Sequence, residues 1–257
     1  MQKIACIGAG KLASQLMPVL EHAGYDVVQV YSKTSISANL LATSLKHAMA
    51  TTDLSKIQKD ADFYFFALKD DVMEAVVNEL GYLENEKSIF LHTSGILPLK
   101  AIPFERRGIF YPLQTFSPSH AVNWKKTPLL VTGENEEITA SLKVMASKIS
   151  DLVYKAGDED RAALHVAAVF ANNFTNHMLT LAEKICNEHH VSFEILKPII
   201  RETIEKALDA GPSNSQTGPA IRGDQQTIDK HLKMLENNSG LQELYRMITQ
   251  SIMRNAK

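Results

Sequence analysis

The chain has 257 residues, 45% of them hydrophobic and 22% charged, a composition typical of a globular protein with one large domain or two modest ones. Its formal net charge of −2 argues against nucleic acid or a membrane surface as the main partner. The two cysteines, Cys6 and Cys186, have neither metal-ligand spacing nor partners for a disulfide framework, so we expect no bound metal. Without a signal peptide or an apolar run of membrane-spanning length, the sequence predicts a cytoplasmic protein.

Short apolar runs alternate with amphipathic stretches over the first half of the chain, the pattern of βαβ units and a parallel sheet. In chain order we predict a strand at 3–7, a helix at 12–23, a strand at 26–31, a helix around 37–45, strands at 47–50 and 63–68, a helix at 71–80 and a strand at 88–92. Strands at 108–111 and 129–131, a helix at 136–150 and a last strand at 152–154 follow.

The pattern changes near residue 155. Helix-compatible spacing then continues over residues 159–189, roughly eight turns, which is far longer than an average helix. Further helices are predicted at 193–209, 225–235 and 241–255. We therefore predict an α/β domain over residues 1–153 and an all-helical domain over residues 154–257.

The first predicted strand runs into the sequence GAGKLA, residues 8–13. Gly8 permits a tight turn, Gly10 lets the backbone approach a pyrophosphate, and Ala13 is small enough for close helix–strand packing. The N–H groups that begin the next helix would face the diphosphate. This context predicts a nicotinamide dinucleotide site, rather than a structural turn of another α/β fold, formed by Gly8, Ala9, Gly10, Lys11 and Leu12.

The end of the second strand distinguishes NADP from NAD. An NAD site normally places Asp or Glu there to bind the ribose 2′-hydroxyl, and this sequence has no acid at that point. Serine and threonine hydroxyls could instead hydrogen-bond a 2′-phosphate, and a lysine could neutralise it. The sequence thus favours NADP over NAD, with the 2′-phosphate bound by Ser32, Lys33, Thr34 and Ser35. The alternative is that Lys33 is a solvated loop residue.

Two more loops follow strand ends, where ligands bind in open parallel sheets. We expect them to contact the cofactor through Ala67, Leu68, Lys69, His92, Thr93 and Ser94. Asp70 and Asp71 have a simpler use, capping the next helix. Ser94 and Gly95 likewise have two interpretations, a plain turn or a substrate-orienting group.

The long predicted helix carries polar side chains along one face of an otherwise apolar run. His165, Asn172 and Asn173 belong to this stripe, which either lines a wet cleft or is satisfied between helices. A loop near residue 220 adds Arg222, a guanidinium suited to a substrate carboxylate or to an internal ion pair.

Several segments together resemble a bacterial family that joins a Rossmann-like NADP-binding domain to a helical domain of unassigned function. They are GAGKLA, HTSG at 92–95, GIFYPLQTF at 108–116, HVAAVFANNF at 165–174 and TGPAIRGDQQTI at 217–228. Members are provisionally described as NADP-dependent oxidoreductases. The chain is more distantly similar to 6-phosphogluconate and β-hydroxyacid dehydrogenases, ketopantoate reductase and pyrroline-5-carboxylate reductase.

This resemblance implies a doubly wound, mostly parallel Rossmann sheet, followed by a helical domain like the C-terminal domain of 6-phosphogluconate dehydrogenase. In such relatives the helical domain often forms a homodimer. The implied reaction is hydride transfer between NADP and a small carbonyl compound, a ketopantoate-like 2-oxoacid or a cyclic imine.

The resemblance also suggests roles for the polar side chains. The β-hydroxyacid dehydrogenases carry a catalytic lysine on the helix where this chain has His165, which makes His165 the candidate proton donor. Asn172, Asn173 and Ser94 would orient the substrate, and Arg222 would bind its carboxylate. Two other functions stay open: a non-catalytic NADP sensor, and an oxidoreductase that uses a deazaflavin as second cofactor.

Overall fold

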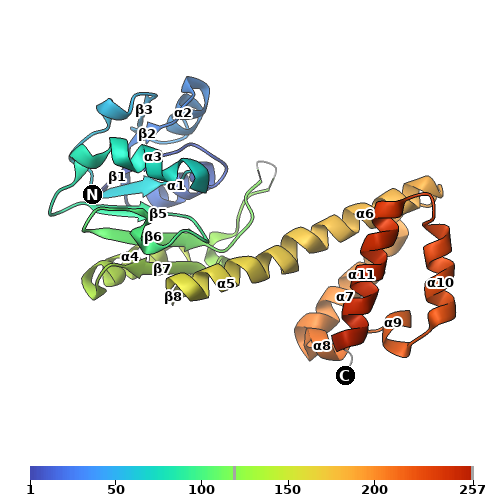
Figure 1. The fold of residues 1–257 in the computed structure, drawn as a ribbon. Helices are drawn as coiled ribbons and strands as arrows, with labels where there is room; N and C mark the ends of the chain where they lie inside the picture. Colours follow the sequence, from blue (N-terminus) through green and yellow to red (C-terminus); the bar gives the residue numbers. More distant parts are fainter. Residues whose placement is uncertain (118–119, 256–257) are drawn as a thin grey trace. The chain divides into compact units, whose positions relative to one another are not determined.

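The computed structural model describes residues 1–117 and 120–255, which divide into two compact units, Met1–Asn176 and His177–Lys257 (Figure 1). The first unit contains an eight-stranded sheet in the order β3-β2-β1-β4-β5-β6-β7-β8. Its strands are β1 (Lys3–Ile7), β2 (Asp26–Tyr31), β3 (Met49–Thr51), β4 (Phe63–Phe66), β5 (Ile89–His92), β6 (Arg107–Pro112), β7 (Leu129–Gly133) and β8 (Val153–Lys155). All neighbours pair in parallel except β6 and β7. This is the predicted doubly wound Rossmann-type fold.

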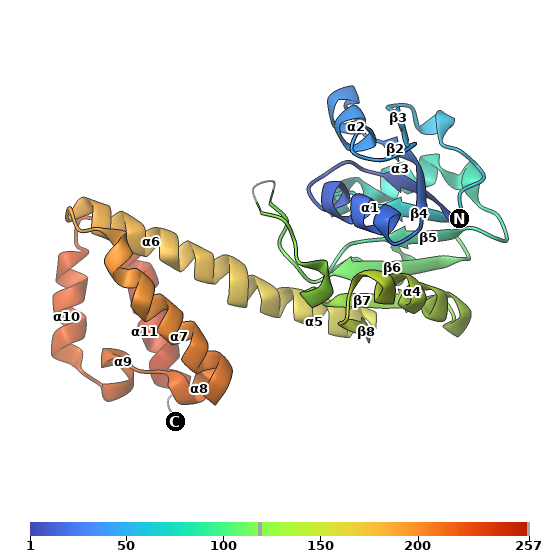
Figure 2. The ribbon, with the colours of Figure 1, turned by 180° about the vertical axis from the view of Figure 1, so that it is seen from behind.

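Helices cover both faces of the sheet, because its central strands are apolar on both sides (Figures 1 and 2). Phe63 and Phe65 join one core with α1 (Ala13–His22) and α4 (Glu136–Ile149). Tyr64 and Phe66 join the other core with α3 (Asp70–Glu79). Side chains of successive strand residues point to opposite faces, so an unbroken FYFF run supplies both cores. Another helix, α2 (Ser35–Ala42), connects β2 to β3.

The predicted long helix is interrupted, which corrects the sequence-based expectation of one regular helix. It consists of α5 (Asp158–Ala168), a π-helical segment (Val169–Phe174) and α6 (Thr175–Glu188). Thr175 Oγ1 donates to the carbonyl of Phe170, five residues earlier, at 3.4 Å. The spacing of apolar residues in the sequence does not reveal where the backbone hydrogen bonds of a helix change from the i−4 to the i−5 partner. Such widenings are frequent at functional sites.

The second unit is all-helical in its described residues. After α6 come a 3₁₀ turn (Phe193–Leu196), α7 (Lys197–Ala210), α8 (Pro212–Ser215), α9 (Pro219–Arg222), α10 (Gln225–Met234) and α11 (Ser239–Asn255). None of the helices in the described residues is long and apolar enough to cross a membrane. The division into domains after residue 153 stays our prediction.

Candidate functional site

The turn after β1 has the backbone shape that a dinucleotide needs. Gly8 has φ +116°, and a Cβ there would lie 2.2 Å from the carbonyl oxygen of Ala67. At Gly10 a Cβ would meet nothing within 4 Å, so the space above this glycine is open. Ala13 is fully buried where α1 crosses the sheet. A backbone cradle with an open side at the start of a helix fits a pyrophosphate. Ala9, Lys11 and Leu12 complete this turn, with Lys11 exposed.

The segment after β2 is accessible. Ser32 is half-buried, and Lys33, Thr34 and Ser35 are exposed. Thr34 is the N-cap of α2, since its Oγ1 accepts from the N–H of Ser37 at 3.4 Å. Its hydroxyl also donates to Ser37 Oγ at 2.9 Å. The segment therefore presents a cation and hydroxyls beside a helix N-terminus, which fits a phosphate.

The loops after β4 and β5 meet the glycine turn at the same sheet edge, because β1, β4 and β5 are parallel neighbours. The Ala67 N–H donates to the carbonyl of Ile7 at 2.9 Å, and Thr93 Oγ1 donates to that of Phe66 at 3.4 Å. Leu68 is half-buried and Lys69 is exposed. Asp70 and Asp71 lie in the first turn of α3, where carboxylates favour the helix dipole, although neither makes a side-chain cap bond.

His92 and Ser94 organise their own loop. Nε2 of His92 donates to the carbonyl of Pro98 at 3.2 Å, while Nδ1 accepts the N–H of Ser94 at 3.3 Å. Burial, together with the nearby Arg161 charge, lowers the pKa of His92 to about 4, so the imidazole is neutral. Ser94 Oγ accepts from the N–H groups of Ile96 and Leu97 at 3.1 and 3.0 Å. These bonds are those of a capped turn, and the substrate-orienting role of Ser94 stays a prediction.

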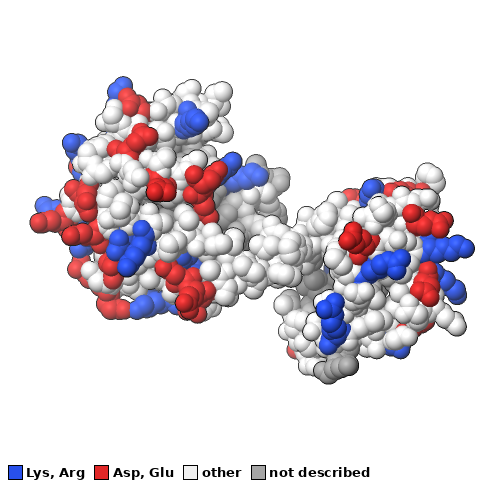
Figure 3. Space-filling model, in the orientation of Figure 1, with Lys and Arg blue, Asp and Glu red and all other residues white. Residues whose placement is uncertain are grey.

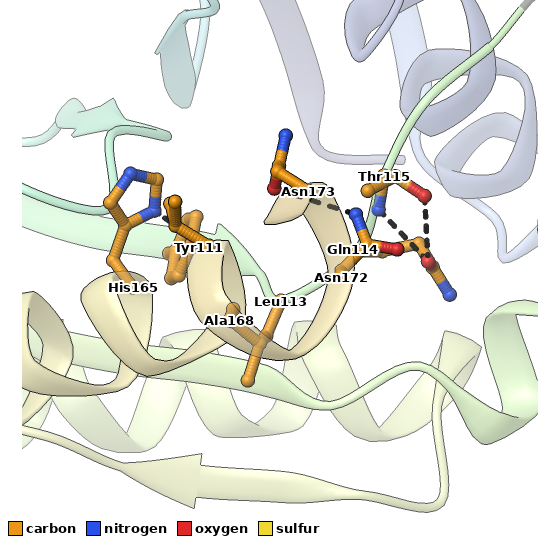
Figure 4. A pocket seen from close by; sticks show the side chains of 9 residues that line it. Tyr111, Leu113, Gln114, Thr115, His165, Ala168, Asn172 and Asn173 are labelled. Carbon is orange, nitrogen blue, oxygen red and sulfur yellow. Dashed lines mark hydrogen bonds between the residues drawn. The ribbon is translucent and has the colours of Figure 1, made fainter. Parts of the chain in front are cut away.

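A cavity of about 170 Å³ opens at the end of β6, which runs parallel to β5. His165, Asn172 and Asn173 reach it from α5 and the π-helical segment (Figure 4). Asn172 Nδ2 donates to Asn173 Oδ1 at 3.4 Å. The π-helical segment supplies both amides and α5 supplies the imidazole of one cavity, whose remaining lining residues are Tyr111, Leu113, Gln114, Thr115, Ala168 and Val169. The three polar residues of the predicted stripe thus line a cleft.

Tyr111 is the main lining residue that sequence reasoning missed. Its hydroxyl lies 3.0 Å from Nδ1 of His165, and the two rings meet edge to face. Gly95 makes this approach possible, because a Cβ there would lie 2.5 Å from His165 Nδ1 and 2.9 Å from Tyr111 Cζ. Tyr111, Gln114 and Thr115 all belong to the GIFYPLQTF segment. The available signal was that Tyr111 lies near the end of β6 and that Gln114 and Thr115 follow this strand, which pairs in parallel with β5.

Arg161 is a second missed residue. It is fully buried one helical turn before His165. Its Nη2 pairs with Asp158 Oδ1 at 3.0 Å and donates to the carbonyl of Leu97. The Asp158 carboxylate accepts the N–H of Leu99 at 3.0 and 3.1 Å. The start of α5 is thereby tied to the loop after β5.

Arg222 belongs to the second unit, and the residues that line the cavity belong to the first. It is exposed at the end of α9, followed by Gly223 in the left-handed region at φ +65°. Asp224 then caps α10, because Oδ1 accepts the N–H of Thr227 at 3.1 Å and Oδ2 accepts its hydroxyl at 2.8 Å. The carboxylate-binding role of Arg222 stays a prediction.

Comparisons with known proteins agree on an oxidoreductase. Residues 3–91 match the model of a family described as NADP oxidoreductase, coenzyme F420-dependent, and residues 127–252 match a domain of unknown function, DUF2520. A solved structure from Bacteroides fragilis, provisionally named an NADP oxidoreductase, is 38% identical, with 98% of each chain covered and a TM-score of 0.92. No curated protein sequence matches the chain.

Two more solved structures share the fold at low identity. An imine reductase variant from Myxococcus stipitatus in complex with NAD+ is 14% identical, with 100% of each chain covered and a TM-score of 0.65. A reductive aminase from Aspergillus terreus in complex with NADPH and ethyl levulinate is 15% identical, with 98% of this chain and 94% of that chain covered and a TM-score of 0.68. Identities this low show the fold alone.

Proposed function

We propose a function for this chain, which belongs to the family of NADP oxidoreductases represented by the Bacteroides fragilis protein. It is an oxidoreductase with a Rossmann-type dinucleotide domain. We propose that it reduces a small carbonyl compound, a 2-oxoacid or a cyclic imine. The observation that carries this is the cavity of His165, Asn172 and Asn173, which opens at the same sheet edge as the glycine turn.

Gly8, Ala9, Gly10, Lys11 and Leu12 would hold the pyrophosphate, and Ser32, Lys33, Thr34 and Ser35 a 2′-phosphate. The loops after β4 and β5, with Ala67, Leu68, Lys69, His92, Thr93 and Ser94, would flank the central riboses. When bound, the nicotinamide supplies or accepts a hydride. Preference for NADP over NAD is supported by the absence of a carboxylate in residues 31–35 and by the exposed Lys33.

His165 would donate the proton that completes reduction, because its imidazole lines the cavity and histidine is the most common general acid. The Asn172 and Asn173 amides would hydrogen-bond the substrate, and Ser94 would keep the adjoining turn in place. The cavity of about 170 Å³ suits the reacting end of a small substrate. A deazaflavin as second cofactor is a second candidate, favoured by the description of the family that matches residues 3–91.

Small-molecule chemistry is also supported by the surface charge. Lys and Arg are interspersed with Asp and Glu over the visible face of the first unit (Figure 3). A nucleic-acid partner would favour a patch of one sign. Arg222 would bind a substrate carboxylate, and the helical unit would form a homodimer.

The first experiment titrates the protein with NADPH and NADH, then assays oxidation of the bound form with 2-oxoacids, cyclic imines and a deazaflavin. Turnover on one class establishes that chemistry. Tight binding without turnover on any class favours a sensor. Failure to bind either nucleotide contradicts the proposal.

A Lys33→Asp variant tests the 2′-phosphate site. The carboxylate would repel the phosphate, so the NADPH/NADH affinity ratio should fall by about tenfold or more, or about 1.4 kcal/mol. Lys46→Asp is the matched control, since Lys46 precedes β3 at the opposite edge of the sheet. An unchanged ratio in Lys33→Asp would remove Lys33 from the site.

A further inference from the structure

The Tyr111–His165 contact joins two groups that can each donate or accept a hydrogen bond. Burial raises the pKa of Tyr111, and only the Arg161 charge opposes this, so the phenol is protonated near neutral pH. We take the phenol as the donor to Nδ1 of His165, 3.0 Å from its oxygen, a direction that sets the tautomer of the neutral imidazole. An imidazole that accepts at Nδ1 carries its proton on Nε2. The other ring nitrogen of His165 points away from Tyr111 (Figure 4).

The Tyr111 and His165 rings are held in place by the loop after β5 and by the start of α5. Gly95 leaves no room for a side chain between the two rings and the loop after β5. That loop is tied to α5 through Asp158 and Arg161, one turn before His165. Small displacements of the imidazole relative to the phenol are therefore resisted by buried contacts.

Arg161 adds a charge suited to an anion. Its side chain is fully buried, and its Nε and Nη1 have no hydrogen-bond partner among the described residues. The Arg161 charge acts on Tyr111, and Arg161 and Asp158 from α5 act on His92 at the end of β5. Asp158 is 42% exposed, so its carboxylate is screened by solvent more than the guanidinium is. A phenolate at Tyr111 would thus form near the Arg161 charge, which lowers the pKa of the phenol against the larger effect of burial.

We propose that Tyr111 is a proton-relay and positioning residue behind His165, with Arg161 as the counter-charge for the phenolate. This rests on the reductive function proposed above. As the Nε2–H bond of His165 breaks and an O–H or N–H bond forms on the substrate, Nδ1 takes the proton of Tyr111. To reset, Nε2 takes one proton from solvent and Nδ1 returns its proton to Tyr111. One proton is consumed per turnover, which balances the hydride.

The first test reads the histidine tautomer directly, without substrate. Protein labelled with ¹⁵N-histidine is studied by NMR at neutral and mildly alkaline pH, and His165 is assigned with His165→Gln. The wild type should show an unprotonated Nδ1 and a protonated Nε2. Tyr111→Phe keeps the ring and removes the donor, so it should give a mixture of tautomers. Tyr154→Phe, on the exposed face of β8, is the matched control and should leave His165 unchanged.

The second test uses turnover. Tyr111→Phe should lower kcat by about 10- to 100-fold and leave the NADPH dissociation constant unchanged. Added to His165→Gln, it should cost nothing further, because the relay acts only through the imidazole. A proton on Nδ1 in the wild type, or additive losses in the double variant, would overturn the relay. If none of the tested compounds supports NADPH oxidation by the wild type, the proposed function fails. The NMR experiment then still shows whether Tyr111 donates its hydrogen bond to His165.

Discussion

His92 ends β5 with no exposed surface, and both of its ring nitrogens are used by the turn that follows. Sequence reasoning placed this residue among the cofactor contacts because it follows a strand end. Its side chain bonds Pro98 and Ser94. A contact of this loop with a cofactor stays a prediction. The neighbouring Gly95 has more than a turn-forming role, because it lets His165 and Tyr111 approach the loop.

The pKa of His92 predicts how stability depends on pH. Burial lowers it to about 4 in the folded protein, against about 6.5 in the unfolded chain. Unfolding therefore takes up a proton between these values. The stability present above pH 6.5 is lost as the pH falls towards 4, by up to about 3 kcal/mol.

Urea unfolding at pH 7.5 and pH 4.5 measures this effect. His92→Gln should be less stable than the wild type at pH 7.5 but should lose clearly less stability on acidification. His47→Gln, which replaces an exposed histidine, is the control. An equal acid-induced loss in the wild type and His92→Gln would contradict the assignment.

Between elements, the contact that matters most joins α5 to the loop after β5. Asp158 accepts the N–H of Leu99, and Arg161 pairs with Asp158 and donates to the Leu97 carbonyl. A buried guanidinium that loses its partner is costly, whereas removing both charges is often close to neutral. The π-helical segment begins two turns later and brings Asn172 and Asn173 to the cavity.

Asp158→Asn should lower the free energy of unfolding by about 1–3 kcal/mol, a range reduced from that of a fully buried pair because Asp158 is partly exposed. The double variant Asp158→Asn/Arg161→Met should recover a large part of that loss. Glu136→Gln removes an exposed partner of Lys155 and should change stability by less than about 0.5 kcal/mol. Urea unfolding of the three variants and the wild type measures these free energies. A loss below about 0.5 kcal/mol in Asp158→Asn would show that the Asp158–Arg161 pair contributes little to stability.

At the scale of the whole molecule, the two units differ in how much core they bury. The sheet unit has extensive apolar cores on both faces of its sheet. In the described part of the helical unit, the buried hydrophobic side chains are Ala220, Ile228 and Leu232. Ile199 and Leu208 on α7 are 63% and 81% exposed. A folded unit of this size buries more apolar side-chain surface than these three residues provide. This supports the proposed homodimer through the helices of the second unit.

Sedimentation velocity tests this. The wild type should sediment as a dimer, and its unfolding temperature should rise with protein concentration. Leu208→Glu should weaken the dimer, whereas Ile36→Glu, which replaces an exposed residue of α2 in the other unit, should not. A wild type that is monomeric at all concentrations would contradict the proposal.

The amino-acid sequence by itself determined the features that arise from near neighbours in the chain. The alternation of apolar runs and amphipathic stretches predicted the Rossmann-type sheet and the helical region after it, and both are confirmed. Gly8, Gly10 and Ala13 predicted the dinucleotide turn, because a strand, a tight turn and a helix in succession define that geometry locally. The composition alone would have allowed many functions, whereas these motifs pointed to an oxidoreductase.

Only the tertiary structure brought together groups far apart in the chain. Tyr111 and His165 are 54 positions apart, and Arg161 lies 64 positions from the Leu97 carbonyl that it binds. No periodicity in the sequence relates such pairs, because their meeting depends on strand order, on the packing of α5 and on the missing side chain at Gly95. The π-helical widening was equally hidden, since a change of hydrogen-bond partner within a helix leaves the residue types unchanged. The sequence therefore predicted the cofactor turn, and the fold created the cavity at the same edge of the sheet.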